Sequence, residues 1–361
     1  MMLLAILLSC LISSSSAFSC KDQHDFDVPW FAAYKMPKGI LGDAVGSKYG
    51  VGFYYLDSND RTSLKPSAVM INESHQAIGY TLNQYYSDRL DGDLLHLFYN
   101  DEPVKSLLPK VEETSEKSVE HGHTKGVLLF DRKSGTGLWL VHSVPLFPDP
   151  NFWTYPDSGA KFGQTFLCMT LDVSELKLLG TVLYYNHAWV YDYNMPDWAN
   201  DISPDLAKVV KGKYNADPFD TSLKEGLKIA NAVDNTPFTV FAKTHLLDDD
   251  LWAKLVAPEY GSLDVETWRD GHLIDMDCLT KDVVYDAQTI QVGQSAEFKY
   301  TKDHSKYART VSQDAGVVCI GDINRMTSQY KRGGGTVCVK EPNLWKAWSV
   351  FKQLPNCDFP Q

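Results

Sequence analysis

Runs of apolar residues along the first half of the chain predict a protein built mainly on strands. Residues 28–35, VPWFAAYK, have the pattern of a buried strand, and the Pro-Lys-Gly segment 37–39 ends it. Residues 126–130 and 138–144 are apolar runs on either side of a Gly-containing turn, which predicts a β-hairpin. Residues 109–122 are charged and almost free of large apolar side chains, so we expect a solvated loop leading into that hairpin.

The second half of the chain repeats this pattern more weakly. We expect a strand at residues 262–268, extended structure over 296–309 and a short strand at 317–320. The aromatic segment 183–193 could stack on nucleic-acid bases, but its alternation favours a buried strand. Residues 343–352 place apolar side chains on one helical face behind an Asn cap, which predicts a helix packed on a sheet.

The N-terminal segment has the pattern of a cleaved leader. An apolar run of about ten residues is too short to span a bilayer, and Ser15-Ser16-Ala17 suits signal cleavage. We therefore predict a signal peptide at residues 1–17. No later stretch is apolar enough for a membrane helix, so we expect no membrane anchor.

The cysteines agree with entry into the secretory pathway. Six remain after removal of the leader, without a Cys-x-x-Cys pair, and they are Cys20, Cys168, Cys278, Cys319, Cys338 and Cys357. In an oxidising compartment this set predicts three disulfides, for which spacing alone leaves the pairing open. Asn72 begins the sequon Asn-Glu-Ser and is the predicted glycosylation site.

The 361 residues, 44% of them apolar, suffice for one large core or two ordinary ones. The net charge of −12 at pH 7 argues against binding a polyanion through the bulk field at neutral pH. Ten histidines would bring the net charge toward zero near pH 5. An anionic substrate is therefore easier to bind in an acidic compartment.

Two His-x-Lys motifs lie about half a chain length apart and carry the candidate chemistry. Residues two apart on an extended strand face the same side, so His123 projects with Lys125, and His304 with Lys306. Two such strands side by side would gather two imidazoles and two ammonium groups. One imidazole could attack a phosphodiester, the other could protonate the leaving oxygen, and the lysines could neutralise phosphate without a metal or other cofactor. One His-x-Lys alone would be unremarkable.

The blocks HGHTKGVLLFD, GLWLVHSVP, DHSK, CIGDINR and RGGGTVC resemble, in this order, the deoxyribonuclease II family. That family is similar to phospholipase D-type phosphodiesterases. The resemblance implies an α/β fold of two similar halves, residues 18–180 and 181–361, with mixed sheets flanked by helices and the active site between them. It also implies a metal-free acid endonuclease of the lysosome, or one released by secretion, that degrades engulfed or apoptotic DNA.

The family chemistry assigns roles to the motifs. It implies a phosphohistidine intermediate and products with 3'-phosphate and 5'-hydroxyl ends, formed from double-stranded or single-stranded DNA. By analogy His123 is the nucleophile and His304 the general acid, although the symmetry of the motifs leaves the reverse order open. Asn324 matches an amide that holds a phosphate oxygen or orients an imidazole. No Asp follows His304 at the spacing usual in the wider superfamily.

Supporting positions have two interpretations each. His142 and Ser143 stand where the second half has Gly-Asp, and are either phosphate-contacting groups or structural ones. The Gly run 333–335 could present amides to phosphate or form a tight turn, and His121 is expected to be a loop residue rather than a metal ligand. The family pattern further implies the disulfides Cys20–Cys168, Cys278–Cys357 and Cys319–Cys338.

Other functions and states also fit the sequence. A lipid phosphodiesterase of the phospholipase D type is one alternative, and a secreted, non-catalytic DNA-binding protein is another. Both a monomer and a homodimer are compatible with the sequence.

Overall fold

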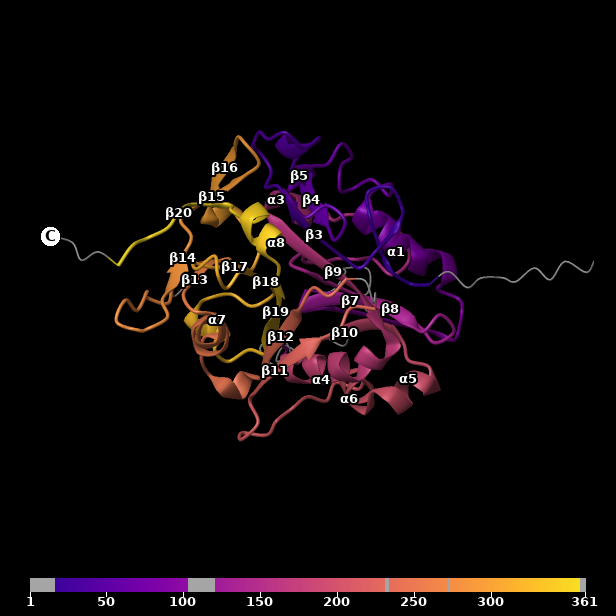
Figure 1. The fold of residues 1–361 in the computed structure, drawn as a ribbon. Helices are drawn as coiled ribbons and strands as arrows, with labels where there is room; N and C mark the ends of the chain where they lie inside the picture. Colours follow the sequence, from indigo (N-terminus) through magenta and orange to yellow (C-terminus); the bar gives the residue numbers. More distant parts are fainter. Residues whose placement is uncertain (1–16, 103–120, 231–233, 272, 358–361) are drawn as a thin grey trace, which may run out of the picture.

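Two large β-sheets pack face to face and carry helices on their flanks (Figure 1). The computed structural model describes residues 17–102, 121–230, 234–271 and 273–357. The predicted signal peptide, apart from its last residue, and nearly all of the predicted loop 109–122 lie outside these residues.

The first sheet has eight strands in the order β10-β6-β7-β8-β9-β3-β4-β5, and all neighbours are antiparallel. Its strands are β3 (Trp30–Lys35), β4 (Phe53–Asp57), β5 (Lys65–Pro66), β6 (Leu94–Asn100), β7 (Lys125–Asp131), β8 (Thr136–His142), β9 (Gln164–Asp172) and β10 (Val190–Asn194).

The second sheet has seven strands in the order β11-β12-β19-β18-β17-β13-β14, and only β13 and β14 run parallel. Its strands are β11 (Ser222–Leu227), β12 (Phe238–Lys243), β13 (Leu263–Glu266), β14 (Val284–Asp286), β17 (Tyr307–Thr310), β18 (Val317–Gly321) and β19 (Gly334–Lys340). The run β6-β7-β8-β9-β3 in the first sheet has the same order as β13-β17-β18-β19-β12 in the second. In both runs the last-named strand comes first along the chain.

Short strands complete the sheet structure. A two-stranded pair joins β1 (Cys20–Lys21) to β2 (Asp27–Val28), and a three-stranded sheet contains β15 (Thr289–Val292), β16 (Ala296–Lys299) and β20 (Phe351–Gln353).

Helices pack on both sheets, and two of them lie on the outer faces. Helix α1 (Ala77–Asp88) packs on the outer face of the first sheet, and α7 (Ala257–Tyr260), after a π-helical turn over Trp252–Val256, packs on that of the second. Helix α4 (Leu176–Asn186) contacts β11, β12 and β19 and is followed by α5 (Asp197–Ile202) and α6 (Pro204–Val209), near the bottom of Figure 1. The short helices α3 (Asp157–Lys161) and α8 (Pro342–Ala347) precede β9 and follow β19.

The main core lies between the two sheets. In β3, Trp30, Ala32 and Tyr34 face this core, while Phe31 and Ala33 face the cluster that includes α1. Both faces of the strand are therefore buried, which explains a continuous apolar run rather than an alternating one. The same holds for β7, whose seven residues are all buried.

Several predicted elements are confirmed. The strand at 28–35 is β3, the hairpin is β7 and β8, the strand at 262–268 contains β13, and the strand at 317–320 is β18.

Three predictions are wrong in part. The segment 183–193 is the end of α4 followed by β10, because Leu176, Leu179 and Leu183 continue a helical spacing that a buried-strand interpretation ignored. The predicted helix 343–352 ends at Ala347, since Phe351 pairs with β15 as part of β20.

The segment 296–309 is not continuously extended. It contains β16, a 3-10 turn over Tyr300–Lys302, the second His-x-Lys and β17.

The three disulfides implied by the resemblance are present: Cys20–Cys168, Cys278–Cys357 and Cys319–Cys338. The last joins two residues that are direct partners in the register of β18 and β19. Asn72 is exposed, and its glycosylation stays a prediction. Across the part of the chain that the structure describes, no helix is long and apolar enough to cross a membrane.

The predicted division at 180/181 falls inside α4. The first sheet also takes β10 from beyond that point, so the two sheets do not follow it residue for residue. The division stays a prediction.

Candidate active site

Each His-x-Lys motif lies where the chain enters a central strand. Lys125 is the first residue of β7, and Lys306 directly precedes β17. His123, Lys125 and Lys306 are buried, and His304 is half-buried. Both histidines therefore precede the strands. The alternation in the sequence, in contrast, places them on the strands.

Each motif is hydrogen-bonded to the opposite sheet. The backbone N–H of His123 donates to the carbonyl of Gly333, which directly precedes β19, at 2.8 Å. The backbone N–H of His304 donates to the carbonyl of Gly163, directly before β9, at 2.9 Å. Each motif thus contacts a residue next to a strand of the other sheet, so both motifs lie at the interface between the two sheets.

Two buried lysines hold the loops that receive these contacts. Lys35, at the end of β3, donates to the carbonyls of Ala160 and Phe162. Lys243, at the end of β12, donates to the carbonyls of Tyr330 and Arg332, both at 2.7 Å. Burial lowers the pKa of both lysines, that of Lys243 to about 8.

His123 has an oxygen acceptor beside each ring nitrogen. Its Nδ1 hydrogen-bonds the carbonyl of Asp322, and its Nε2 lies 3.7 Å from Oδ2 of Asp101. Thr124 donates to the carboxylate of Asp322, whose other oxygen accepts the N–H of Gly335 at 2.9 Å. Burial raises the pKa of Asp322 to about 6.

Asp101 and Arg332 complete this part of the site, and the motif search missed both. Asp101 accepts from Lys125 and, at 3.1 Å, from Arg332. Burial raises the pKa of Asp101, but Lys125, His123 and Arg332 together outweigh burial and leave that pKa below its ordinary value. The one signal for Asp101 in the sequence is its place directly after the apolar run of β6.

His304 has different surroundings. Its ring stacks on Phe162 with centroids 4.0 Å apart and planes at 8°, and Trp268 lies at 4.0 Å on a 58° tilt. Its Nε2 is buried without a hydrogen-bond partner among the described residues. Burial, then Lys306, Lys125, Lys35 and Lys161, lower the pKa of His304 to about 2.

The lysine of each motif acts on the histidine of the other. Lys125 depresses the pKa of His304, and Lys306 that of His123, after burial. Lys306 donates to the carbonyl of His304, and burial followed by the field of Lys125 lowers the pKa of Lys306 to about 7. The four predicted residues therefore surround one centre.

The predicted supporting residues divide into two groups. Asn324 follows Asp322 in the loop after β18, is buried, and leaves its Oδ1 without a partner among the described residues. Ser143 donates to Gln164 at 2.5 Å and accepts from the N–H of Thr165 at 3.0 Å, so its hydroxyl is occupied.

His142 is fully buried, with the rings of Phe147 and Phe166 at 5.3 and 6.1 Å. Its Nδ1 accepts the N–H of Val144 at 3.2 Å, and burial lowers its pKa to about 3. A neutral imidazole in this setting suits the structural interpretation.

The Gly run and His121 are also accounted for by contacts. The N–H of Gly335 is bound to Asp322, and a Cβ on Gly333 would lie 2.6 Å from the carbonyl oxygen of Asn186. His121 stacks on Trp189 at 4.7 Å. Among the described residues, no group of three or more His, Cys, Asp or Glu side chains is arranged to hold a metal ion.

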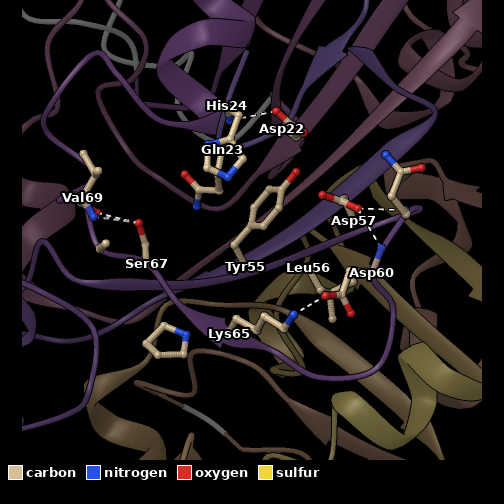
Figure 2. A pocket seen from close by; sticks show the side chains of 13 residues that line it. Asp22, Gln23, His24, Tyr55, Leu56, Asp57, Asp60, Lys65, Ser67 and Val69 are labelled. Carbon is tan, nitrogen blue, oxygen red and sulfur yellow. Dashed lines mark hydrogen bonds and ion pairs between the residues drawn. The ribbon is translucent and has the colours of Figure 1, made fainter. Parts of the chain in front are cut away.

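A separate cavity of about 420 Å³ lies at β4 and β5 (Figure 2). Tyr55, Asp57 and Lys65 line it, and Lys65 pairs with Asp60. None of the predicted site residues lines this cavity.

Comparison with known proteins identifies the family. A profile of the deoxyribonuclease II family matches residues 19–357. Deoxyribonuclease-2 of Caenorhabditis elegans is 43% identical over 98% of both chains, and plancitoxin-1 of Acanthaster planci is 35% identical over 96% of this chain and 94% of its own. Deoxyribonuclease-2-alpha of Mus musculus is 34% identical over 95% of this chain and 94% of its own. With this coverage and the two interlocked His-x-Lys motifs, the chain belongs to the deoxyribonuclease II family.

Proposed function

We propose that this protein is an acid endonuclease that hydrolyses DNA phosphodiester bonds. The observation that carries the proposal is the meeting of both His-x-Lys motifs at one buried centre. The chain as a whole is acidic, at −12, yet five cations act on the two histidines: Lys35, Lys125, Lys161, Lys306 and Arg332. A local excess of cations in an acidic protein suits a phosphodiester that must enter against the bulk field.

The reaction has two displacements. In the first, the neutral imidazole of one motif attacks phosphorus, the P–O5' bond breaks, and the other imidazole gives its proton to the departing 5' oxygen. DNA then remains attached through its 3'-phosphate to a histidine. In the second, the histidine that gave its proton takes one from water, the water oxygen forms a bond to phosphorus, and the P–N bond breaks to release the first histidine. The products carry 3'-phosphate and 5'-hydroxyl ends.

Lysines and an amide take the electrostatic role. Lys125 and Lys306 neutralise the non-bridging oxygens, and the Asn324 side-chain NH₂ donates to one of them. Because the pKa of Lys306 is about 7, its ammonium is fully charged only below neutral pH. Phosphate binding through Lys306 therefore improves as pH falls through 7.

A two-half, phospholipase D-like arrangement is part of the proposal. Three observations support it. The strand orders of the two sheets match, and His123 and His304 each hydrogen-bond a residue beside the opposite sheet. Lys35 and Lys243 also donate to loop carbonyls in corresponding places. The active centre would then lie near an approximate twofold axis between residues 18–180 and 181–361. Because both motifs come from one chain, the centre needs no second copy. Whether the protein dimerises stays a prediction.

The compartment follows from the same chemistry. Three disulfides are compatible with a lysosomal or secreted protein, and an acid optimum suits the lysosome. We propose that it digests engulfed or apoptotic DNA there after the leader is removed.

Replacing His304 with alanine tests the proposal. Plasmid cleavage at pH 5 in EDTA should fall by about 10³-fold or more, because a nucleophile or general acid is removed. His24→Ala, an exposed histidine outside the site, is the matched control and should cleave normally. End-group analysis should find 3'-phosphates.

Several results would contradict the proposal. Among them are full activity in His304→Ala, a strict metal requirement with an alkaline optimum, and turnover of phosphatidylcholine in preference to DNA. The last would favour the lipid phosphodiesterase, and binding of DNA without any cleavage would favour the non-catalytic protein.

A further inference from the structure

We propose that Asp101 is a positioning residue that holds the His123 imidazole for catalysis and ties it, through Arg332, to the second sheet. The inference rests on the proposed function, since it assigns a role within the same centre. Asp101 acts through His123 and Lys125 and does not itself need to touch DNA.

Strand pairing delivers the Asp101 carboxylate to this place. The last residue of β6, Asn100, is the register partner of Lys125, so the next residue reaches the motif directly. Asn100 also donates to the carbonyls of Val144 and Phe147 at 3.0 Å each, and its Oδ1 accepts the N–H of Glu102 at 2.9 Å. The turn that aims Asp101 is thereby fixed on both sides.

The two carboxylate oxygens of Asp101 contact different side chains. Oδ1 accepts from Lys125, while Oδ2 accepts from Arg332 at 3.1 Å and lies 3.7 Å from Nε2 of His123. Arg332 also donates to the carbonyls of His121 and Gly122 at 3.2 Å each, directly before His123. One guanidinium thus binds both the carboxylate and the backbone that leads into the motif.

A hydrogen bond at Nδ1 and a carboxylate oxygen 3.7 Å from Nε2 suit a His123 that carries a proton during the cycle. The charged groups that face it are Asp101 from the end of β6, Lys125 from β7, Lys306 before β17 and Arg332 before β19, with the Asp322 carbonyl after β18. Asp101 is the one group in this set that raises the pKa of His123. The Asp322 carboxylate, whose own pKa burial raises, is bound by Thr124 and Gly335. Burial and Lys125 lower the pKa of His123, and Asp101 opposes them.

The second half has no carboxylate at the matching position. Glu266, the last residue of β13, is the register partner of Tyr307, so Trp268 takes after β13 the place that Asp101 takes after β6. Trp268 packs on His304. Neutralising Asp101 should therefore disturb one histidine and leave the other as it was.

The pH dependence of kcat and KM in Asp101→Asn provides the test. Without this anion, Lys125, Lys306 and Arg332 lower the pKa of His123 unopposed by Asp101. The pKa should fall by about one to three pH units, the field of one charge near 4 Å at effective dielectric constants of 80 to 20. The limb of the bell-shaped profile that belongs to His123 should move to lower pH, and kcat should fall by about tenfold or more. KM for DNA should stay unchanged or fall, because a negative charge has been removed.

The limb of the pH profile that moves also shows which histidine is the nucleophile and which is the general acid. Movement of the ascending limb identifies His123 as the nucleophile, and movement of the descending limb identifies it as the general acid. Either movement supports the proposal. A profile that matches the unmodified protein in both limbs, at whatever amplitude, overturns it.

Two further variants keep the result interpretable. Asp192→Asn is the matched control, because Asp192 pairs with His96 at 3.0 Å within the same sheet but outside the site, and its profile should be unchanged. If Asp101→Asn does not fold, the double variant Asp101→Asn, Arg332→Gln removes one unpaired cation with the anion and should fold. The same limb should then be displaced by less than in Asp101→Asn, because Arg332 also lowers the pKa of His123.

Failure of the proposed function would look different. In that case His123→Ala and His304→Ala would retain plasmid cleavage, whatever the behaviour of Asp101.

Discussion

Replacing Asp322 with asparagine should make the stability of the protein less dependent on pH. Asp322 is 4% exposed, and burial raises its pKa from 3.8 to about 6. Asparagine has the same shape and no charge. Its oxygen can accept from Gly335, and its NH₂ can donate to Thr124, whose hydroxyl rotates to accept.

The sign follows from proton linkage. Between the ordinary pKa and the raised one, the folded protein holds a proton that the unfolded chain has released, so stability falls as pH rises through this window. At about 1.4 kcal/mol per pH unit, the loss from pH 4.5 to pH 6 is about 2 kcal/mol for the natural residue. Asparagine has no such loss.

The free energy of unfolding should be measured by urea denaturation of both proteins at pH 4.5 and pH 7. The difference between variant and natural protein should shift by about 2 kcal/mol in favour of the variant at the higher pH. Titrating groups that do not interact with Asp322 are common to both proteins and cancel. Lys306 is an exception, because Asp322 raises its pKa. A difference that is the same at both pH values would refute a raised pKa for Asp322.

Three other changes have definite expected outcomes. Phe162→Leu removes the ring stacked on His304, so water should reach that imidazole and the limb of the pH profile belonging to it should move to higher pH. Lys35→Met frees the carbonyls of the loop before β9 and should lower kcat by about tenfold or more in a plasmid assay. The double variant Cys319→Ala, Cys338→Ala should lose about 3 kcal/mol of stability in a thermal melt and also lose activity, because this disulfide flanks the loop that binds His123.

The phenylalanine and lysine changes each have a control from the same chain. Phe26→Leu and Lys48→Met alter exposed residues and should leave the pH profile and kcat unchanged. Unchanged limbs in Phe162→Leu, or normal kcat in Lys35→Met, would contradict the roles given to those side chains. Full activity with a lower melting temperature in the cysteine variant would separate the disulfide from catalysis.

Local pattern sufficed for the strands that are buried on both faces. The runs in β3 and in the β7–β8 hairpin are continuous and bounded by turn residues, so their assignment depends on few neighbours. The segment 183–193 could not be assigned in this way, because its aromatic residues divide between the last turn of α4 and the edge strand β10. Which of the two each residue joins depends on contacts with β12 and β6, which are distant in sequence.

The sequence by itself determined the reacting groups: two imidazoles and two ammonium groups in matched motifs, with six cysteines for three disulfides. Only the tertiary structure decided that the two histidines differ, with Asp101 and Arg332 beside His123 and an aromatic stack around His304. Charge interactions fall off with distance and are strongest where water is excluded. A residue's pKa and orientation therefore depend on which remote strands pair around it, and this pairing is a property of the folded chain.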